Sequence, residues 1–214
     1  MDPPPPPPGE GEGPPPRRGR PGTGYDRDRS RHTAVPLTDA ELARVMAAAA
    51  RADLGAWFPG FEAAHLIEFV YLTGAHPDVI AHPGRYDLRT EGRNGHLHVI
   101  WGRPKKRGVY ALTDLPVVRS DAPAASWLPG WVRGLRAHTY GSRHLNRLCH
   151  LVGKEAGVPF SLRTLRHCCG VRIARKARDP ARVQAWLNCS AQVALQYTRI
   201  ASADDPRMLE LAEG

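Results

Sequence analysis

The last third of the chain is predicted to be almost wholly helical, which constrains the fold more than any other feature of the sequence. Apolar residues recur at helical spacing over four segments, residues 142–156, 161–176, 179–188 and 190–201. Gly157-Val158-Pro159 separates the first two segments, and Asp179-Pro180 opens the third. Proline lacks a backbone N–H and disfavours helical geometry in the residue before it, so each break ends one helix before the next begins.

The preceding part of the chain predicts two more helices and a small hairpin. Thr38 and Glu41 have the spacing of a capping box, so a helix should follow and run to about Arg51. The other expected elements are a helix over 61–72, strands over 96–101 and 109–112, and a turn over 103–108. The first strand should place three apolar residues on one face: Leu97, Val99 and Trp101. This order of elements predicts an α+β fold, mainly helical, with a small antiparallel sheet.

The first 36 residues differ in composition from the rest. They hold eleven of the 21 prolines, almost no large apolar residue and a cluster of arginines. Such a segment cannot bury enough apolar surface to offset the entropy lost on ordering, so we expect residues 1–36 to be disordered and residues 37–214 to form one domain. The arginines of the tail either follow a phosphate backbone or are simply solvated.

The charge of the chain points to a polyanionic partner. Thirty Lys and Arg residues against 21 Asp and Glu give a formal net charge of +9 at pH 7. An excess of this size favours nucleic acid, although it is also compatible with a solubility device. We find no apolar run long enough to span a membrane and no signal peptide, and the four cysteines lack a metal-binding or disulfide pattern. We therefore expect a cytoplasmic protein, associated with the nucleoid if prokaryotic, without metal or cofactor.

One group of polar residues in the helical third has a distinctive spacing. SLRTLRH at 161–167 opens a helix, and LN at 187–188 precedes Tyr197 by nine residues. This box resembles that of tyrosine recombinases of the phage-integrase type, in which His-x-x-Arg precedes a Leu-Gly-His turn and then a tyrosine. Arg163 and Arg166 match the His-x-x-Arg positions, and Asn188 matches the turn histidine.

The resemblance continues upstream and covers about residues 37–201. Residues 73–76, TGAH, stand where the family has Thr-Gly-x-Arg, and the hairpin with Lys105 and Lys106 stands where it carries a catalytic lysine. The resemblance implies a catalytic domain for DNA recombination, and integration of a mobile element is one such reaction. The partner it implies is double-stranded DNA, bound by a homo-oligomer or with another protein that completes the clamp.

The resemblance also implies a role for each matched residue. Tyr197 would be the nucleophile that forms a 3′-phosphotyrosyl link, and Arg166 would bind the phosphate oxygens. Lys105, or Lys106, would protonate the departing 5′-oxygen. The cations expected to contact DNA are Arg103, Lys106, Arg107, Arg172, Arg175 and Lys176. We expect the phenol, the Arg166 guanidinium and the hairpin ammonium to converge on one phosphate-sized hollow.

Three positions depart from the family pattern. His76 replaces the first arginine, Arg163 replaces a histidine that shuttles protons, and Asn188 keeps only a hydrogen-bond donor. Losing one preorganised donor costs about 3 to 4 kcal/mol of transition-state stabilisation. Three readings stay open: an active recombinase, a catalytically degraded relative that binds DNA as an accessory or regulator, and a helical DNA-binding protein unrelated to recombinases.

Overall fold

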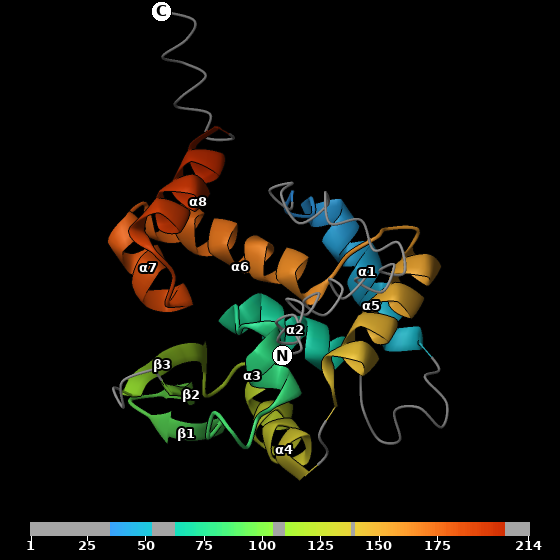
Figure 1. Ribbon diagram of the computed structural model, residues 1–214, viewed down its shortest axis with the longest axis horizontal. Helices are drawn as coiled ribbons and strands as arrows, with labels where there is room; N and C mark the ends of the chain where they lie inside the picture. The colour runs from blue at the N-terminus through green and yellow to red at the C-terminus, as the bar shows by residue number, and fades with distance from the viewer. Residues whose placement is uncertain (1–34, 53–62, 105–109, 138–139, 204–214) are drawn as a thin grey trace, which may run out of the picture. The chain divides into compact units, whose positions relative to one another are not determined.

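The computed structural model describes residues 35–52, 63–104, 110–137 and 140–203. Within these residues it has eight helices and one three-stranded antiparallel sheet in the order β1-β2-β3, which confirms the predicted α+β class (Figure 1). The predicted tail lies outside the described residues except for Val35 and Pro36. No described helix is long and apolar enough to cross a membrane.

The elements follow one another closely along the chain. Their bounds are α1 Asp39–Arg51, α2 Ala63–Thr73, α3 Pro77–Ala81, β1 Arg89–Arg93, β2 His96–Pro104, β3 Tyr110–Arg119, α4 Pro123–Ala137, α5 Ser142–Ala156, α6 Leu162–Ala177, α7 Pro180–Leu187 and α8 Ala191–Ala203. The capping box at Thr38 and Glu41 is formed, and the four predicted C-terminal helices are α5 to α8. Strand β3, which was predicted over 109–112, is longer than expected, since it runs to Arg119.

Three elements are not predicted by the sequence pattern, each for a physical reason. Strand β1 has no apolar alternation because it is a polar edge strand, yet the Asn94-Gly95 turn that joins it to β2 is a strong hairpin signal. Helix α3 is only five residues long. Helix α4 contains Pro129 and two glycines, but it buries Ala124, Leu128, Val132 and Leu135 at helical spacing, and this packing outweighs its poor propensity.

The main hydrophobic core surrounds α2. Leu66, Ile67, Phe69 and Val70 of this helix are fully buried, since α2 contacts α1, α4 and α6 and also β3. The inner face of the sheet joins the same core through Leu97, Val99 and Trp101, as predicted, together with Leu115.

A second, smaller core lies where α7 and α8 pack on one end of α6 (Figure 1). Helix α6 contributes to both cores. Leu162 and Leu165, near its start, belong to the main core, whereas Cys169 and Ala174 belong to the second. This long helix therefore fixes α7 and α8 relative to α2, and the site described below lies along it.

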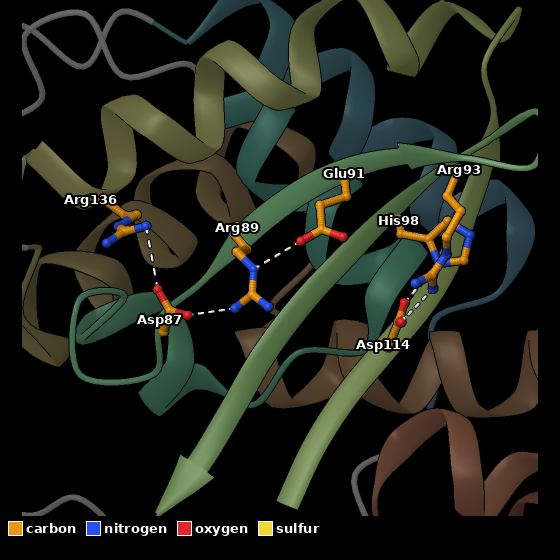
Figure 2. Close-up of polar contacts among 7 residues, drawn as sticks. All are labelled: Asp87, Arg89, Glu91, Arg93, His98, Asp114 and Arg136. Carbon is orange, nitrogen blue, oxygen red and sulfur yellow. Dashed lines mark hydrogen bonds and ion pairs between the residues drawn. The ribbon is translucent and has the colours of Figure 1, made fainter.

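Charged residues cover the outer face of the sheet (Figure 2). Arg93 and His98 both contact the carboxylate of Asp114, at 2.5 and 2.7 Å. Although burial opposes the shift, the hydrogen bonds from Arg93 and His98 lower the pKa of Asp114. The contacts of Arg93 and His98 with Asp114 therefore link β1, β2 and β3 on the face of the sheet that does not join the core.

Candidate active site

Arg166 connects two distant segments of the chain. Helix α6 begins with a capping box between Ser161 and Thr164, which sets its register and places Arg166 in its second turn. The guanidinium donates to the carbonyl of Gly74, after α2, and to the carbonyl of Leu187, at the end of α7, at 2.7 Å. Arg166 is therefore held between the α2–α3 turn and the α7–α8 turn.

The α2–α3 turn requires a glycine. Gly74 has φ +62°, and a Cβ there would overlap Leu187 and approach the Cys169 sulfur at 3.1 Å. The preceding Thr73 is buried, donates to the Phe69 carbonyl at 2.7 Å and accepts from the Ala75 amide at 3.0 Å. These contacts fix the conformation of the Thr73-Gly74 pair and set the position of His76.

His76 caps the short helix α3. Its Nδ1 accepts a hydrogen bond from the Asp78 amide at 3.2 Å. Its backbone is extended at φ −65° and ψ 141°, which agrees with the restriction that Pro77 places on it. Because Nδ1 is an acceptor here, the ring proton of a neutral His76 must be on Nε2.

Asn188 ends α7 in the left-handed conformation, with φ 48° and ψ 50°. Asparagine tolerates this conformation better than most residues, so part of its role is to shape the turn. Its amide nitrogen donates to the hydroxyl of Thr113, on the inner face of β3, at 3.4 Å. The α7–α8 turn is thereby linked to the sheet.

His76, Arg166 and Asn188 meet around one cavity of about 70 Å³. Its remaining lining residues are Asp78, Val79, Tyr86, Trp101 and Leu187. The Asp78 carboxylate accepts a hydrogen bond from Tyr86, and this bond, against the effect of burial, lowers the pKa of Asp78. Three of the predicted catalytic residues, separated widely in sequence, thus share one small hollow.

Tyr197 does not line this cavity. Its side chain is only 4% exposed and packs on α6, where a Cβ at Gly170 would lie 2.8 Å from the ring. Burial raises the pKa of the phenol to about 12, against the opposing effect of the Arg166 charge. The expectation that phenol and guanidinium open into one hollow is therefore not met in this structure.

The phenol of Tyr197 instead contacts His167, a residue to which the sequence analysis gave no role. The Tyr197 oxygen lies 2.7 Å from His167 Nδ1, and the two rings are tilted with centroids 5.5 Å apart. Burial, followed by the charges of Arg163 and Arg166, lowers the pKa of His167. The only hint in the sequence is that His167 directly follows Arg166 in the box.

The other predicted residues are distributed as follows. Arg163, Arg175 and Lys176 are exposed on α6. Arg172 is half-buried, donates to the Leu72 carbonyl at 2.9 Å and lies over the Tyr71 ring, so it stabilises the end of α2. Lys105, Lys106 and Arg107 lie outside the described residues, and Arg103 is described only as a backbone position in β2.

A second, larger hollow of about 440 Å³ lies between the sheet and the α6–α7 pair. Its lining includes the basic residues His96, Arg119, Arg172, Lys176 and Arg182. Arg119 pairs with Asp121 and Arg182 with Asp179, so this surface is less positive than its arginines alone suggest. Across the described part of the chain, no group of three or more His, Cys, Asp or Glu could hold a metal ion.

No known protein family and no curated protein matches the sequence, but solved structures match the fold. A post-cleavage complex of the XerH site-specific recombinase with palindromic difH is 18% identical, covers 84% of this chain and 52% of its own, and has a TM-score of 0.63. A pre-cleavage complex of XerH with difH is 19% identical, covers 84% of this chain and 53% of its own, and has a TM-score of 0.56. The XerA recombinase is 17% identical, covers 78% of this chain and 59% of its own, and has a TM-score of 0.53.

The chain spans about half the length of the XerH recombinase chains that it matches. A match over 84% of the chain takes in most of the described residues. The described residues between 35 and 203 therefore adopt the fold of a tyrosine-recombinase catalytic domain.

Proposed function

We propose that this protein binds double-stranded DNA and cleaves and rejoins one strand through a 3′-phosphotyrosyl link to Tyr197. The observation that carries the proposal is the cavity shared by His76, Arg166 and Asn188 within a fold found in site-specific recombinases. These residues come from the three places where the recombinase box predicts groups that bind the scissile phosphate.

In this proposal the cavity residues bind the phosphodiester. Arg166 supplies a planar, permanently charged donor that matches two phosphate oxygens. Asn188 adds a neutral amide donor. His76 adds a hydrogen bond from Nε2, because protonating Nδ1 would break its bond with the Asp78 amide. His76 therefore replaces the arginine of the family pattern with a donor but not with a fixed charge.

The nucleophile has to reach the bound phosphate. The phenol of Tyr197 is buried against α6, yet its partner His167 is the immediate neighbour of Arg166 on the same helix. A local opening over the phenol, with its contact to α6 retained, is the change that the reaction requires. The duplex itself, or a second copy of the chain bound to it, would supply this change.

The remaining roles fall on cations outside the cavity. Lys105 or Lys106 would protonate the departing 5′-oxygen. Arg103, Arg107 and the hairpin lysines would contact the backbone near the scissile phosphate. Arg163, Arg175 and Lys176, which are exposed on α6, would contact it elsewhere. Proteins that neutralise several phosphates lose affinity steeply with salt, so binding should weaken at least tenfold between 50 and 200 mM salt.

The test is a suicide-substrate assay with a pool of nicked duplexes of randomised sequence. The wild-type protein should give a covalent protein–DNA species that resists SDS, and Tyr197→Phe should give none while keeping its affinity for DNA within about twofold. Binding without any covalent species would favour the second candidate, a DNA-binding accessory or regulatory protein. The burial of the phenol and the histidine at position 76 are the observations that favour this second candidate.

A further inference from the structure

We infer that His167 is the general base of the proposed strand cleavage and accepts the proton of the Tyr197 phenol on its Nδ1 as the phenol oxygen attacks phosphorus. This inference rests on the proposed function. It assigns a catalytic role to a residue outside the matched catalytic positions of the box.

Geometry is the first support. A general base must lie within hydrogen-bond reach of the proton that it removes, and His167 Nδ1 is 2.7 Å from the Tyr197 oxygen. The contact joins α6 to α8, whose packing is tight at this point because Gly170 leaves no space between helix and ring. For Tyr197 to donate, His167 must be neutral and carry its proton on Nε2.

The need for a base is the second support. A buried phenol whose pKa is about 12 keeps its proton at neutral pH, so the proton has to leave during attack. Arg163 occupies the position of the family's histidine and cannot accept a proton, and Arg166 cannot either. His167 lies one residue beyond Arg166 and replaces the lost acceptor from the same helix.

The charges around the pair agree with this role. The charged or titratable groups that influence it are Arg163, Arg166, Cys168 and Cys169 on α6 and Cys189 in the α7–α8 turn. Burial and the two arginines lower the pKa of His167, which keeps it neutral and able to accept near pH 7. A bound phosphodiester would bring negative charge beside the arginines and favour the imidazolium that forms.

In the cleavage step, each bond that forms is matched by one that breaks. The bond from the Tyr197 oxygen to phosphorus forms, and the bond from phosphorus to the 5′-oxygen breaks. The phenol proton moves to His167 Nδ1, and the ammonium of the hairpin protonates the 5′-oxygen. During rejoining the 5′-hydroxyl attacks phosphorus and returns its proton to the hairpin amine. The bond from phosphorus to the Tyr197 oxygen breaks, and the imidazolium returns its proton to the departing phenol oxygen.

The experiment measures the single-turnover rate of covalent-complex formation on nicked duplexes for the wild type and for His167→Asn. Asparagine can accept a hydrogen bond near the position of Nδ1 but cannot accept a proton. His167→Asn should therefore be slower by about 10²-fold or more. The matched control is His150→Asn, an exposed histidine on α5, which should keep the wild-type rate.

Two further readouts separate proton transfer from support of the fold. The wild-type rate should fall as pH drops through the pKa of His167, which burial lowers from its ordinary value, and His167→Asn should lack this fall. In His167→Ala, added imidazole should restore part of the rate. Thermal unfolding tests whether each variant is still folded. The ¹⁵N spectra of the free wild-type protein should show an unprotonated Nδ1 on His167.

The outcomes are distinguishable. A wild-type-like rate and pH profile in His167→Asn, or a protonated Nδ1 in the free protein, would overturn the role of His167 and leave the proposed function intact. The absence of any covalent species from the wild type on every duplex would overturn both. A slow His167→Asn variant that imidazole does not rescue in His167→Ala, and that keeps the wild-type pH profile, would reduce His167 to a structural residue.

Discussion

The two sides of α6 differ in a way that defines the candidate site. On one side Arg166 donates to two backbone carbonyls and lines a small cavity with His76 and Asn188. On the other side His167 holds the phenol of Tyr197 in a buried contact. Successive residues of a helix point about 100° apart, so adjacent side chains serve the two halves. The half around the cavity (the cavity half) is assembled, whereas the half around the proposed nucleophile (the nucleophile half) is closed.

The largest expected effect concerns the cavity half. Arg166→Lys should lower the rate of covalent-complex formation by about 10²- to 10³-fold, because a lysine cannot hold two carbonyls and two phosphate oxygens as a planar fork does. Single-turnover assays on nicked duplexes measure this. The exposed Arg133→Lys, on α4, is the control and should change the rate little. An equal loss in both variants would mean that the slower reaction does not depend on the place of Arg166 in the cavity.

The packing of the nucleophile half can be tested through stability. Gly170→Ala should destabilise the protein by about 1–3 kcal/mol, because its Cβ would lie 2.8 Å from the Tyr197 ring. Gly134→Ala, in α4, meets nothing within 4 Å and should stabilise the protein by up to about 1 kcal/mol through helix propensity. Urea unfolding measures both. Equal changes would show that the ring has room to move off α6.

A guanidinium at position 76 should improve phosphate binding in the cavity half. His76→Arg should raise the yield of the covalent complex by roughly tenfold, since it returns a fixed positive charge to the phosphate. It should also cost about 1 kcal/mol of stability, because the cap of α3 is lost. His82→Arg, which lies outside the lining of the cavity, is the control. No gain in yield would indicate that the closed phenol, and not the missing arginine, limits the reaction.

The smallest effect is expected outside both halves, on the outer face of the sheet (Figure 2). Asp114→Asn removes the charge that pairs with Arg93 and His98, and should cost about 1 kcal/mol or less of unfolding free energy at pH 7. Because the pKa of Asp114 is lowered in the fold, its contribution is present above its unfolded value of 3.8 and is lost as pH falls through the folded value. Urea unfolding at pH 7 and pH 3 should show the difference between the two proteins shrinking at acidic pH. A loss equal to that of Gly170→Ala would mean that the ion pairs of Asp114 contribute as much to stability as the packing of the second core.

The helical third illustrates how far local patterns reach. Helical periodicity and the Pro-containing breaks are sufficient for α5 to α8, because these signals depend on neighbouring residues only. The same reasoning fails for α4, where Pro129 signals a break but burial of Leu128 and Val132 prevails. It also fails for β1, whose polar residues carry no alternation and whose pairing with β2 is visible only in the Asn94-Gly95 turn.

The candidate site divides in the same way. The spacing of the box identified Arg166, Asn188 and Tyr197, and the Thr-Gly pair identified His76. It could not identify the partner of Tyr197, because 30 residues separate His167 from that tyrosine and no local pattern relates them. The expectation that the Tyr197 phenol opens into the same hollow as Arg166 was not met, because its contact with His167 is also invisible to local patterns.

By itself, the sequence predicted six of the eight helices of the described residues, the class of fold and a set of candidate residues suited to phosphate chemistry. These follow from periodicity, breaks and spacing, which act over a few residues. Only the tertiary structure decided which of those residues meet. The bond from Arg166 to Gly74 joins positions 92 residues apart, and the packing of α8 on Gly170 turns the phenol toward His167. Such contacts depend on how two cores pack on one helix, and that packing is a property of the whole domain.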